Sequence, residues 1–299
     1  MSYVAGTVLD DTGAAASGRT VRVYRRDTGA LLGETATASG SVTGDADFGS
    51  VVLLLHGNGT NNSTTITDSS FSAKTVTAYG DAKISTTQSK FGGSSITFDG
   101  TGDYLSTTHN DFAFGTGDFT VEMWFYISSL TAGYSHLIDT RTADSNGFGL
   151  GVEADGKVFL FSINAFRVEA GSVSTATWYH IAVSRASGVT KVFLSGTQVG
   201  ADWSASTDYT QTTYLFGKYY GGSSYALNGY IDDIRITKGV ARYTANFTPP
   251  AAAFGDAVVS LSAGGFAVPT SYTGEVNVVC LDDASGTTYN DKILRTTPV

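Results

Sequence analysis

The chain has 299 residues, and its 27 acidic side chains outnumber the 18 Lys and Arg residues, which gives a net charge of −9. This balance argues against a nucleic-acid partner, because binding to the phosphate backbone requires a basic face that releases counterions. The longest apolar run, Val51–Leu55, is much too short to cross a bilayer, which argues against membrane insertion.

The composition predicts an all-β protein. Gly contributes 36 residues and charged residues only 15% of the chain, a profile typical of short strands joined by polar turns. Of the 27 acidic residues, 22 are Asp and five are Glu. Asp favours turns because its side chain bonds its own backbone, whereas Glu favours helices. No stretch has convincing helical periodicity, so we expect strands throughout.

Strand patterns begin near the N-terminus and return near the C-terminus. Residues 4–9 predict a strand, and residues 19–26 and 31–35 flank a Gly-containing turn, which predicts a hairpin. Similar patterns occur at 257–261 and 275–281. The single cysteine, Cys280, lies in the last of these runs, where we expect a small buried residue rather than a reactive thiol.

The two ends are predicted to form one domain. Each terminal piece has about forty-five residues, too few to bury a core alone, whereas together they reach the size of a small sandwich. We therefore predict a discontinuous small β-sandwich, residues 1–47 plus 255–299, with a second domain, residues 48–254, inserted in one of its loops. Three separate units in a row are the alternative.

Two hairpins are predicted inside the central region. Residues 149–154 and 157–163 flank Asp155-Gly156, which is a strong two-residue turn signal. Residues 178–184 and 190–194 form a second antiparallel pair through Ser187-Gly188. In residues 120–127, apolar and polar side chains alternate as in a strand.

Five motifs of the central region carry a family resemblance. In chain order they are VVLLLHG at 51–57, FGGSSITFDG at 91–100, FTVEMWF at 119–125, WYHIAV at 178–183, and the run 228–250 that ends in Pro-Pro. Together they resemble the laminin-G-like, concanavalin A-like jelly rolls, in the version found in bacteriophage structural proteins. The opening hairpin resembles the carboxypeptidase-regulatory-like (transthyretin-like) β-sandwiches of phage tail and fibre proteins. The resemblance implies an antiparallel jelly-roll β-sandwich inserted into a smaller β-sandwich.

Candidate glycan-binding residues lie in the Gly- and Ser-rich segment after residue 213. Sugar-binding surfaces present aromatic faces beside polar hydrogen-bonding groups. Aromatic residues are crowded in this segment, and we expect Tyr219, Tyr220 and Tyr225 to be exposed, with Asn228 nearby. The alternative is an ordinary loop that packs its own tyrosines.

Two Asp-rich turns are candidate calcium sites, because calcium takes six to eight oxygen ligands. Asp99 and Asp103 bracket a Gly-containing turn, and Asp139 and Asp144 lie in a second polar loop. Neither has the spacing of an EF-hand, and the four histidines show no short metal-binding spacing. Calcium is the one cofactor that the sequence suggests.

Two further carboxylates, Asp232 and Asp233, fall within a predicted strand. Carboxylates are costly there unless paired, so we expect one of them to fix a turn backbone or to pair with Arg235 or Arg242, rather than to act as cation ligands or acid–base residues. Arg242 and Tyr243 are expected to hold the exit segment on the sheet.

No catalytic motif accompanies these residues. Concanavalin-like glycoside hydrolases carry paired carboxylates on one strand, typically Glu-x-Asp-x-Glu, and none of the five Glu residues forms that pattern. A Gly-x-Ser-x-Gly nucleophile turn is also missing from the sequence. We therefore expect a protein that is not an enzyme.

The resemblance favours a bacteriophage virion surface protein, either a tail-fibre adhesin or a capsid decoration protein, whose jelly roll binds glycans of the host surface or the environment. Its expected partners are other virion proteins of the capsid or tail, in a multicopy or oligomeric arrangement. No signal peptide is visible, so we expect synthesis in the bacterial host cytoplasm and assembly onto the virion surface. The alternatives are a purely architectural decoration protein without a ligand and, more distantly, a polysaccharide depolymerase.

Overall fold

The computed structural model describes residues 45, 47–70, 72–222 and 224–255, together with the backbone of six terminal strands. The chain divides into two compact units, residues 1–49 with 255–299, and residues 50–254. The all-β prediction is confirmed, because helical structure in the described residues is limited to two 3-10 turns, Phe48–Ser50 and Asn110–Phe112. None of the helices described is long and apolar enough to span a membrane.

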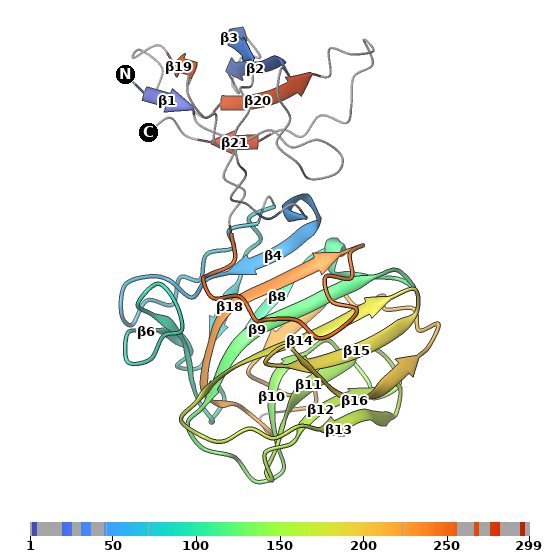
Figure 1. The fold of residues 1–299 in the computed structure, drawn as a ribbon. Coiled ribbons are helices and arrows are strands. Elements are labelled where there is room, and N and C mark those ends of the chain that lie inside the picture. The colour runs from blue at the N-terminus through green and yellow to red at the C-terminus, as the bar shows by residue number, and fades with distance from the viewer. Residues whose placement is uncertain are drawn as a thin grey trace. The chain divides into compact units, whose positions relative to one another are not determined.

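The terminal unit pairs strands from both ends of the chain (Figure 1). Strand β1 (Ser2–Val4) pairs with β19 (Phe266–Val268), and β2 (Thr20–Arg25) lies between β3 (Leu31–Ala36) and β20 (Val276–Leu281), which also pairs with β21 (Leu294–Thr296). The hairpin predicted from residues 19–35 is therefore present as β2 and β3. The strand predicted at 257–261, most of that at 4–9 and the side chain of Cys280 lie outside the described residues.

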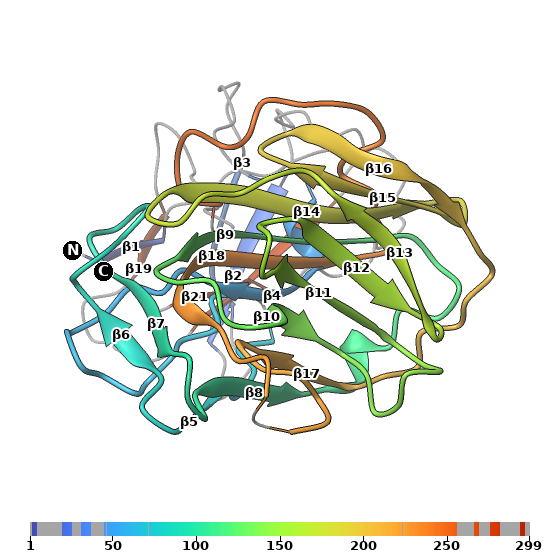
Figure 2. The ribbon, with the colours of Figure 1, turned by 90° about the horizontal axis from the view of Figure 1, so that it is seen from below.

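The central unit consists of two antiparallel sheets that form the two layers of a sandwich (Figure 2). The eight-stranded sheet has the order β16 (Thr197–Ser204), β15 (Val189–Leu194), β14 (Trp178–Ala186), β9 (Phe119–Ile127), β18 (Asn228–Lys238), β7 (Ser95–Asp99), β6 (Lys83–Ser85), and β4 (Val51–Leu55) also pairs with β18. The seven-stranded sheet has the order β13 (Ala165–Ala170), β12 (Val158–Ser162), β11 (Phe148–Glu153), β10 (Tyr134–Asp139), β17 (Thr213–Phe216), β8 (Tyr104–Thr108), β5 (Thr77–Tyr79).

Strand periodicity places the core between these sheets. Val121, Met123 and Phe125 of β9 are buried and belong to the core cluster, as expected for alternate positions of one strand. Both predicted hairpins are present, β11 with β12 and β14 with β15. Ser187 and Gly188 adopt φ angles of 48° and 81°, which the tight turn between β14 and β15 requires.

The outer face of the eight-stranded sheet is buried as well. Glu122 of β9 is completely inaccessible to solvent and receives hydrogen bonds from Arg235 Nε (2.9 Å) and from the Tyr243 hydroxyl (2.8 Å), while His180 Nε2 lies 3.2 Å from its second oxygen. Burial alone would raise the pKa of Glu122, but the hydrogen bond from His180 and the charge of Arg235 outweigh it and hold that pKa below its usual value.

The exit segment, residues 239–254, provides the cover. The Arg242 amide donates to Thr120 Oγ1, and Tyr243 reaches Glu122, so the prediction that these two residues hold the segment on the sheet is confirmed. Phe247 stacks on Tyr243 at a centroid distance of 3.6 Å, and the Arg235 guanidinium lies 3.9 Å from the Phe254 ring.

The two mid-strand carboxylates have different partners. Asp232 Oδ2 accepts the amides of Lys90 (2.7 Å) and Phe91 (3.0 Å), so the prediction that one carboxylate fixes a turn backbone is confirmed. Asp233, at φ 51° in a bulge of β18, accepts the amide of Phe254 and lies 2.6 Å from His56 Nδ1. Arg235, the other partner considered for these carboxylates, is bound to Glu122.

We expect Glu122→Gln to lower the free energy of unfolding of the central unit by about 3 kcal/mol, because removing one partner of a buried ion pair leaves the other charge uncompensated. All three tryptophans, residues 124, 178 and 203, lie in this unit, so urea unfolding followed by tryptophan fluorescence measures it selectively. Asp155→Asn, which removes an exposed partner of Lys157, is the control and should change the midpoint little. An unchanged midpoint for Glu122→Gln would contradict this role.

Asp232 should make the protein more stable at acidic pH. Burial raises the pKa of Asp232 to about 6, although the amides of Phe91 and Lys90 oppose the shift. Between the unfolded pKa near 3.8 and the folded pKa near 6, the folded state binds a proton that the unfolded state lacks, so this contribution is lost as the pH rises. Relative to Asp232→Asn, the wild type should lose roughly 1.4 kcal/mol of unfolding free energy per pH unit in that window. Urea titrations of both proteins at pH 4, 5, 6 and 7 test this, and parallel curves would refute it.

Candidate functional site

A continuous group of aromatic side chains lies on the outer face of the seven-stranded sheet. We call it the aromatic platform, and its members are Tyr134, His136, Phe159, Phe161, Phe166, Tyr219, Tyr220 and Tyr225. Each ring has its centroid within 6 Å of that of another member; for example, Tyr134 lies 5.2 Å from Tyr225 and 5.6 Å from Phe166. The platform therefore extends over strands β10 to β13 and the loop that follows β17.

The register of the strands explains why these residues face outward together. One row across the sheet contains His136, Gly151, Phe159 and Glu169, and the next contains Asp139, Gly149, Phe161 and Phe166. The intervening positions, such as Leu150 and Leu160, belong to the core cluster, so the rows lie on the opposite face.

Two glycines let large side chains lie on the sheet. A Cβ atom on Gly149 would lie 2.7 Å from Arg141 Nη2, and one on Gly151 would lie 2.8 Å from the Phe159 ring. Both distances are too short for real contacts. The glycines of β11 thus form the floor over which Arg141 and Phe159 pack.

The loop after β17 completes the platform. The amide of Leu227 donates to the carbonyl of Gly217, which closes the loop, and the amide of His136 donates to the carbonyl of Tyr225 at 3.1 Å, which ties it to β10. Tyr225 has a φ angle of 64° and its side chain is 38% exposed.

The predicted glycan-binding residues do not all lie together. Tyr225 is exposed as predicted, but Tyr219 and Tyr220 are half-buried because they pack on His136 and Arg141, which corrects the expectation that all three are exposed. Asn228 starts β18 of the other sheet, opposite Asp99, and contributes no ring or hydrogen bond to the platform.

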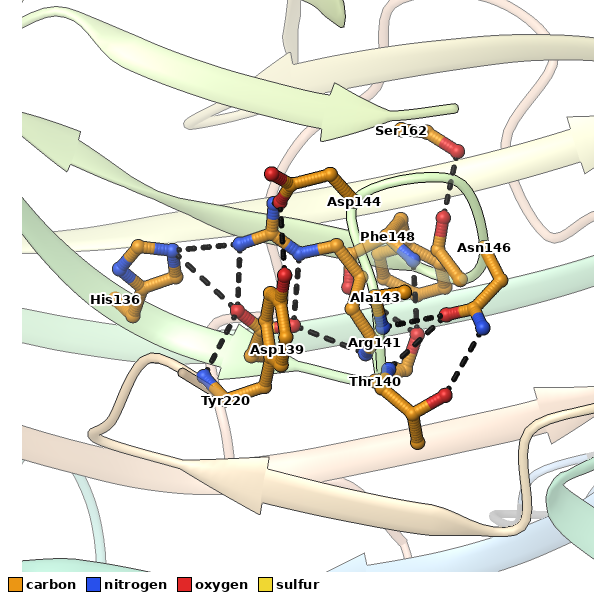
Figure 3. A network of polar contacts seen from close by, with 12 residues as sticks. His136, Asp139, Thr140, Arg141, Ala143, Asp144, Asn146, Phe148, Ser162 and Tyr220 are labelled. Carbon is orange, nitrogen blue, oxygen red and sulfur yellow. Dashed lines mark hydrogen bonds and ion pairs between the residues drawn. The ribbon is translucent and has the colours of Figure 1, made fainter. Parts of the chain in front are cut away.

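A buried arginine, Arg141, lies among the residues of the platform (Figure 3). The Arg141 side chain is 3% exposed and makes a two-point contact with Asp139, through Nε (3.0 Å) and Nη2 (2.7 Å). Its guanidinium also lies 4.7 Å from the Phe161 ring, 5.1 Å from Tyr220 and 5.3 Å from Tyr219. Burial raises the pKa of Asp139, although the Arg141 guanidinium opposes this shift. The arginine therefore holds the tyrosines in place instead of offering its charge to solvent.

His136 is neutral and has one unused hydrogen-bonding atom. Burial and the neighbouring Arg141 lower the pKa of His136 to about 3. Its Nε2 lies 3.1 Å from Arg141 Nη2, a donor, so Nε2 accepts and the proton resides on Nδ1. His136 is 3% exposed, and its Nδ1 has no hydrogen-bond partner.

At both predicted calcium sites, the carboxylate oxygens already accept hydrogen bonds from other groups of the protein. Asp103 is buried and accepts the amides of Asp81 and Asp99, while Asp99 accepts the amide of Thr101. Asp139 and Asp144 are brought together, but by the guanidinium of Arg141 between them. In the part of the chain that the structure describes, no group of three or more His, Cys, Asp or Glu side chains is placed to hold a metal ion.

Sequence reasoning missed Tyr134, His136 and Arg141. The available signal was the Gly149-Leu150-Gly151 pattern, in which small residues alternate with a core residue opposite the alternating Phe159 and Phe161. Such a pattern indicates a strand whose outer face is covered by side chains from elsewhere.

Comparisons with known proteins support the same fold. Residues 99–242 match the family described as the concanavalin A-like lectin/glucanases superfamily, which confirms the laminin-G-like, concanavalin-like fold predicted for the central region. A mutant of HCR/D is 15% identical, with 66% of this chain and 50% of that chain covered and a TM-score of 0.51. Domain 4 of AbnA, an extracellular arabinanase from Geobacillus stearothermophilus solved with arabinotriose, is 16% identical, with coverages of 64% and 93% and a TM-score of 0.48.

A further similar structure is the binding domain of botulinum neurotoxin DC in complex with SialylT, which is 15% identical, with coverages of 64% and 49% and a TM-score of 0.47. The chain covers 31%, 49% and 50% of the first three structures that it matches. At 15% identity, the likeness to the HCR/D mutant shows the fold alone. A sequence comparison with curated proteins found no match.

We expect Arg141→Lys to destabilise the central unit by about 2 kcal/mol or more, because lysine reproduces neither the two-point contact with Asp139 nor the guanidinium contacts with three rings. Urea unfolding should show a lower midpoint, and near-ultraviolet circular dichroism should show a reduced tyrosine signal in the native state. Arg167→Lys is the control, since this partly exposed guanidinium binds two backbone carbonyls and should tolerate the change better. Equal effects of the two substitutions would contradict a special role for Arg141.

Proposed function

We propose that the central unit, residues 50–254, is a non-enzymatic glycan-binding module that holds sugar rings on the aromatic platform. The observation that carries the proposal is the platform itself, a contiguous set of rings of which six remain partly or fully exposed, while His136 and Phe159 are buried among them. Apolar faces of sugar rings stack on such side chains, and nearby polar groups fix their orientation. Asp144, whose side chain is 52% exposed and accepts the Tyr220 hydroxyl, is one such group.

The location of the rings on rigid elements supports binding. Tyr134, Phe159, Phe161 and Phe166 come from strands, and the loop of Tyr219 to Tyr225 is closed by hydrogen bonds at both ends. Side chains that are already ordered lose little conformational entropy when a ligand binds. A weak but specific sugar site is the expected result.

We further propose that the protein is displayed in many copies on the surface of a bacteriophage particle, with the terminal unit, a transthyretin-like sandwich, attached to capsid or tail proteins. The support is the resemblance of the central motifs to phage structural proteins and of the opening hairpin to sandwiches of phage tails and fibres. Many copies would compensate for weak individual sites, because linked binding events multiply the overall affinity.

Tyr225→Ala should weaken glycan binding by the full-length chain about three- to tenfold, the loss expected from removing one stacking ring. Binding is measured by saturation-transfer NMR and by retention on immobilised bacterial surface polysaccharides, with the protein also displayed multivalently on beads. Tyr79→Ala is a matched control, because Tyr79 is 43% exposed but stacks on Tyr104 outside the platform.

Equal losses for both variants would place binding elsewhere. No binding by the wild type, even when displayed multivalently, would overturn the glycan proposal and leave an architectural decoration role.

A further inference from the structure

The outer face of the eight-stranded sheet is not covered along the whole length of its strands. On this face β9 presents Glu122, Trp124 and Tyr126 at alternate positions, of which the first two are buried and Tyr126 is partly exposed. The exit segment lies over Glu122, to which Tyr243 donates a hydrogen bond. Ser128, the next position of this face after Tyr126, is exposed. The cover therefore ends before the last residues of β9, and this part of the sheet is open to solvent.

Three aromatic side chains lie in a row across the open part, and we call them the aromatic row. Trp178 of β14 is opposite Tyr126 of β9, and Tyr126 is in turn opposite Tyr230 of β18. The centroid of the Tyr126 ring lies 5.6 Å from that of Trp178 and 5.6 Å from that of Tyr230, and all three side chains are partly exposed. Ile127 and Ile231, the next residues of two of these strands, belong to the core cluster, so the row lies on the outer face.

Hydrogen-bonding side chains border the row. Asn228 precedes Tyr230 by two positions in β18, on the same face, and is opposite Asp99 of β7. Thr97 of β7 is opposite Tyr230 and continues the row. Asp99 is exposed, and Asn228 and Thr97 are partly exposed. Rings next to an amide, a carboxylate and a hydroxyl are the combination that sugar-binding surfaces present. Asn228, which lies away from the platform, thus belongs to a second group of this kind.

The charges beside the row are of both signs. Asp81 and Asp99 are exposed at the β6–β7 end, where the partly exposed Lys83 is opposite Thr97. On the neighbouring position of the face, the ammonium group of Lys90 lies 3.9 Å from the centroid of the Trp124 ring. Because carboxylates and ammonium groups are mixed, neither an anionic nor a cationic ligand is favoured over an uncharged one.

The aromatic row and the platform lie on opposite sides of the central unit. The two sheets are the two layers of a sandwich (Figure 2), and each of the two aromatic groups lies on the outer face of its own sheet. A sugar chain that is bound to the platform therefore leaves the row free for a second chain.

We propose that the aromatic row is a second glycan-binding site, which takes a neutral, flat, β-1,4-linked sugar chain, so that one central unit holds two chains on its opposite faces. Successive rings of the row come from neighbouring strands, so a chain that runs across the strands places successive sugar units on Trp178, Tyr126 and Tyr230. The row shares its ligand class with the proposed function but none of its residues, so either site can fail alone.

Trp178 reports directly on binding to the row. The full-length protein is titrated with cellotetraose and with the N-acetylglucosamine tetramer, and the tryptophan emission is recorded. A sugar on Trp178 removes water from its indole ring, so we expect a saturable shift of the emission, with cellobiose about tenfold weaker than cellotetraose because it covers fewer rings. Trp178→Phe should abolish the shift, since Trp124 is buried and Trp203 lies on β16, away from the row.

Two alanine variants assign the shift to its face. Tyr230→Ala should raise the half-saturating concentration about three- to tenfold, because one ring of the row is lost. Tyr225→Ala, on the other sheet, should leave the half-saturating concentration for the shift unchanged. An unchanged urea midpoint of Tyr230→Ala shows that a weaker response does not come from unfolding.

The outcomes separate this inference from the proposed function. If Tyr225→Ala abolishes the shift, or if the wild type shows no shift while Tyr225-dependent binding is measured, the second site is overturned and the platform stands. A shift that depends on Tyr230, without any Tyr225-dependent binding, would support the row and overturn the platform. Absence of binding to every ligand would overturn both.

Discussion

The buried carboxylate of Glu122 is the constraint on which the eight-stranded sheet depends. Apolar residues of β9 on one side fill the core, and on the other side a charged residue is sealed from solvent. A buried charge is tolerated only with a complete set of partners. These partners come from β14, β18 and the exit segment, so this face is buried by the last residues of the central unit, which lie across it. The contacts of Glu122 therefore join β9, β14 and β18 to the exit segment.

The outer face of the seven-stranded sheet, in contrast, stays partly open. Its outer face is covered in part by a short loop, and the glycines of β11 allow Arg141 and Phe159 to lie against the backbone. Here the buried ion pair of Arg141 with Asp139 supports rings that still reach solvent. One face of the sandwich is closed around Glu122 by the chain itself, whereas the other keeps an apolar surface that a ligand can cover.

The fold was largely predictable because its signals are local. The hairpins at Asp155-Gly156 and Ser187-Gly188 follow from turn chemistry, and the core of β9 follows from alternation. The site was harder to predict, because the rings of the platform come from three strands and a loop, and only the register of the strands brings them together. Tyr225 was identified by its glycine-rich context, but His136 and Arg141 have no local signal. Their importance comes from a contact between residues of one strand and its following loop, seen only once the sheet is assembled. The role of Glu122 was equally hard to predict, since its burial depends on residues more than a hundred positions away.

Both sheets bury an arginine together with its carboxylate partner. Arg235 is bound by Glu122 and Arg141 by Asp139, so both arginines stabilise the sheets. The Tyr219 and Tyr220 rings lie against the guanidinium of this buried pair, so the platform proposed for glycan binding is ordered before a ligand arrives. Side chains that are ordered in advance lose little entropy on binding. A shallow site of this kind would gain strength from repetition, as proposed for a protein displayed in many copies.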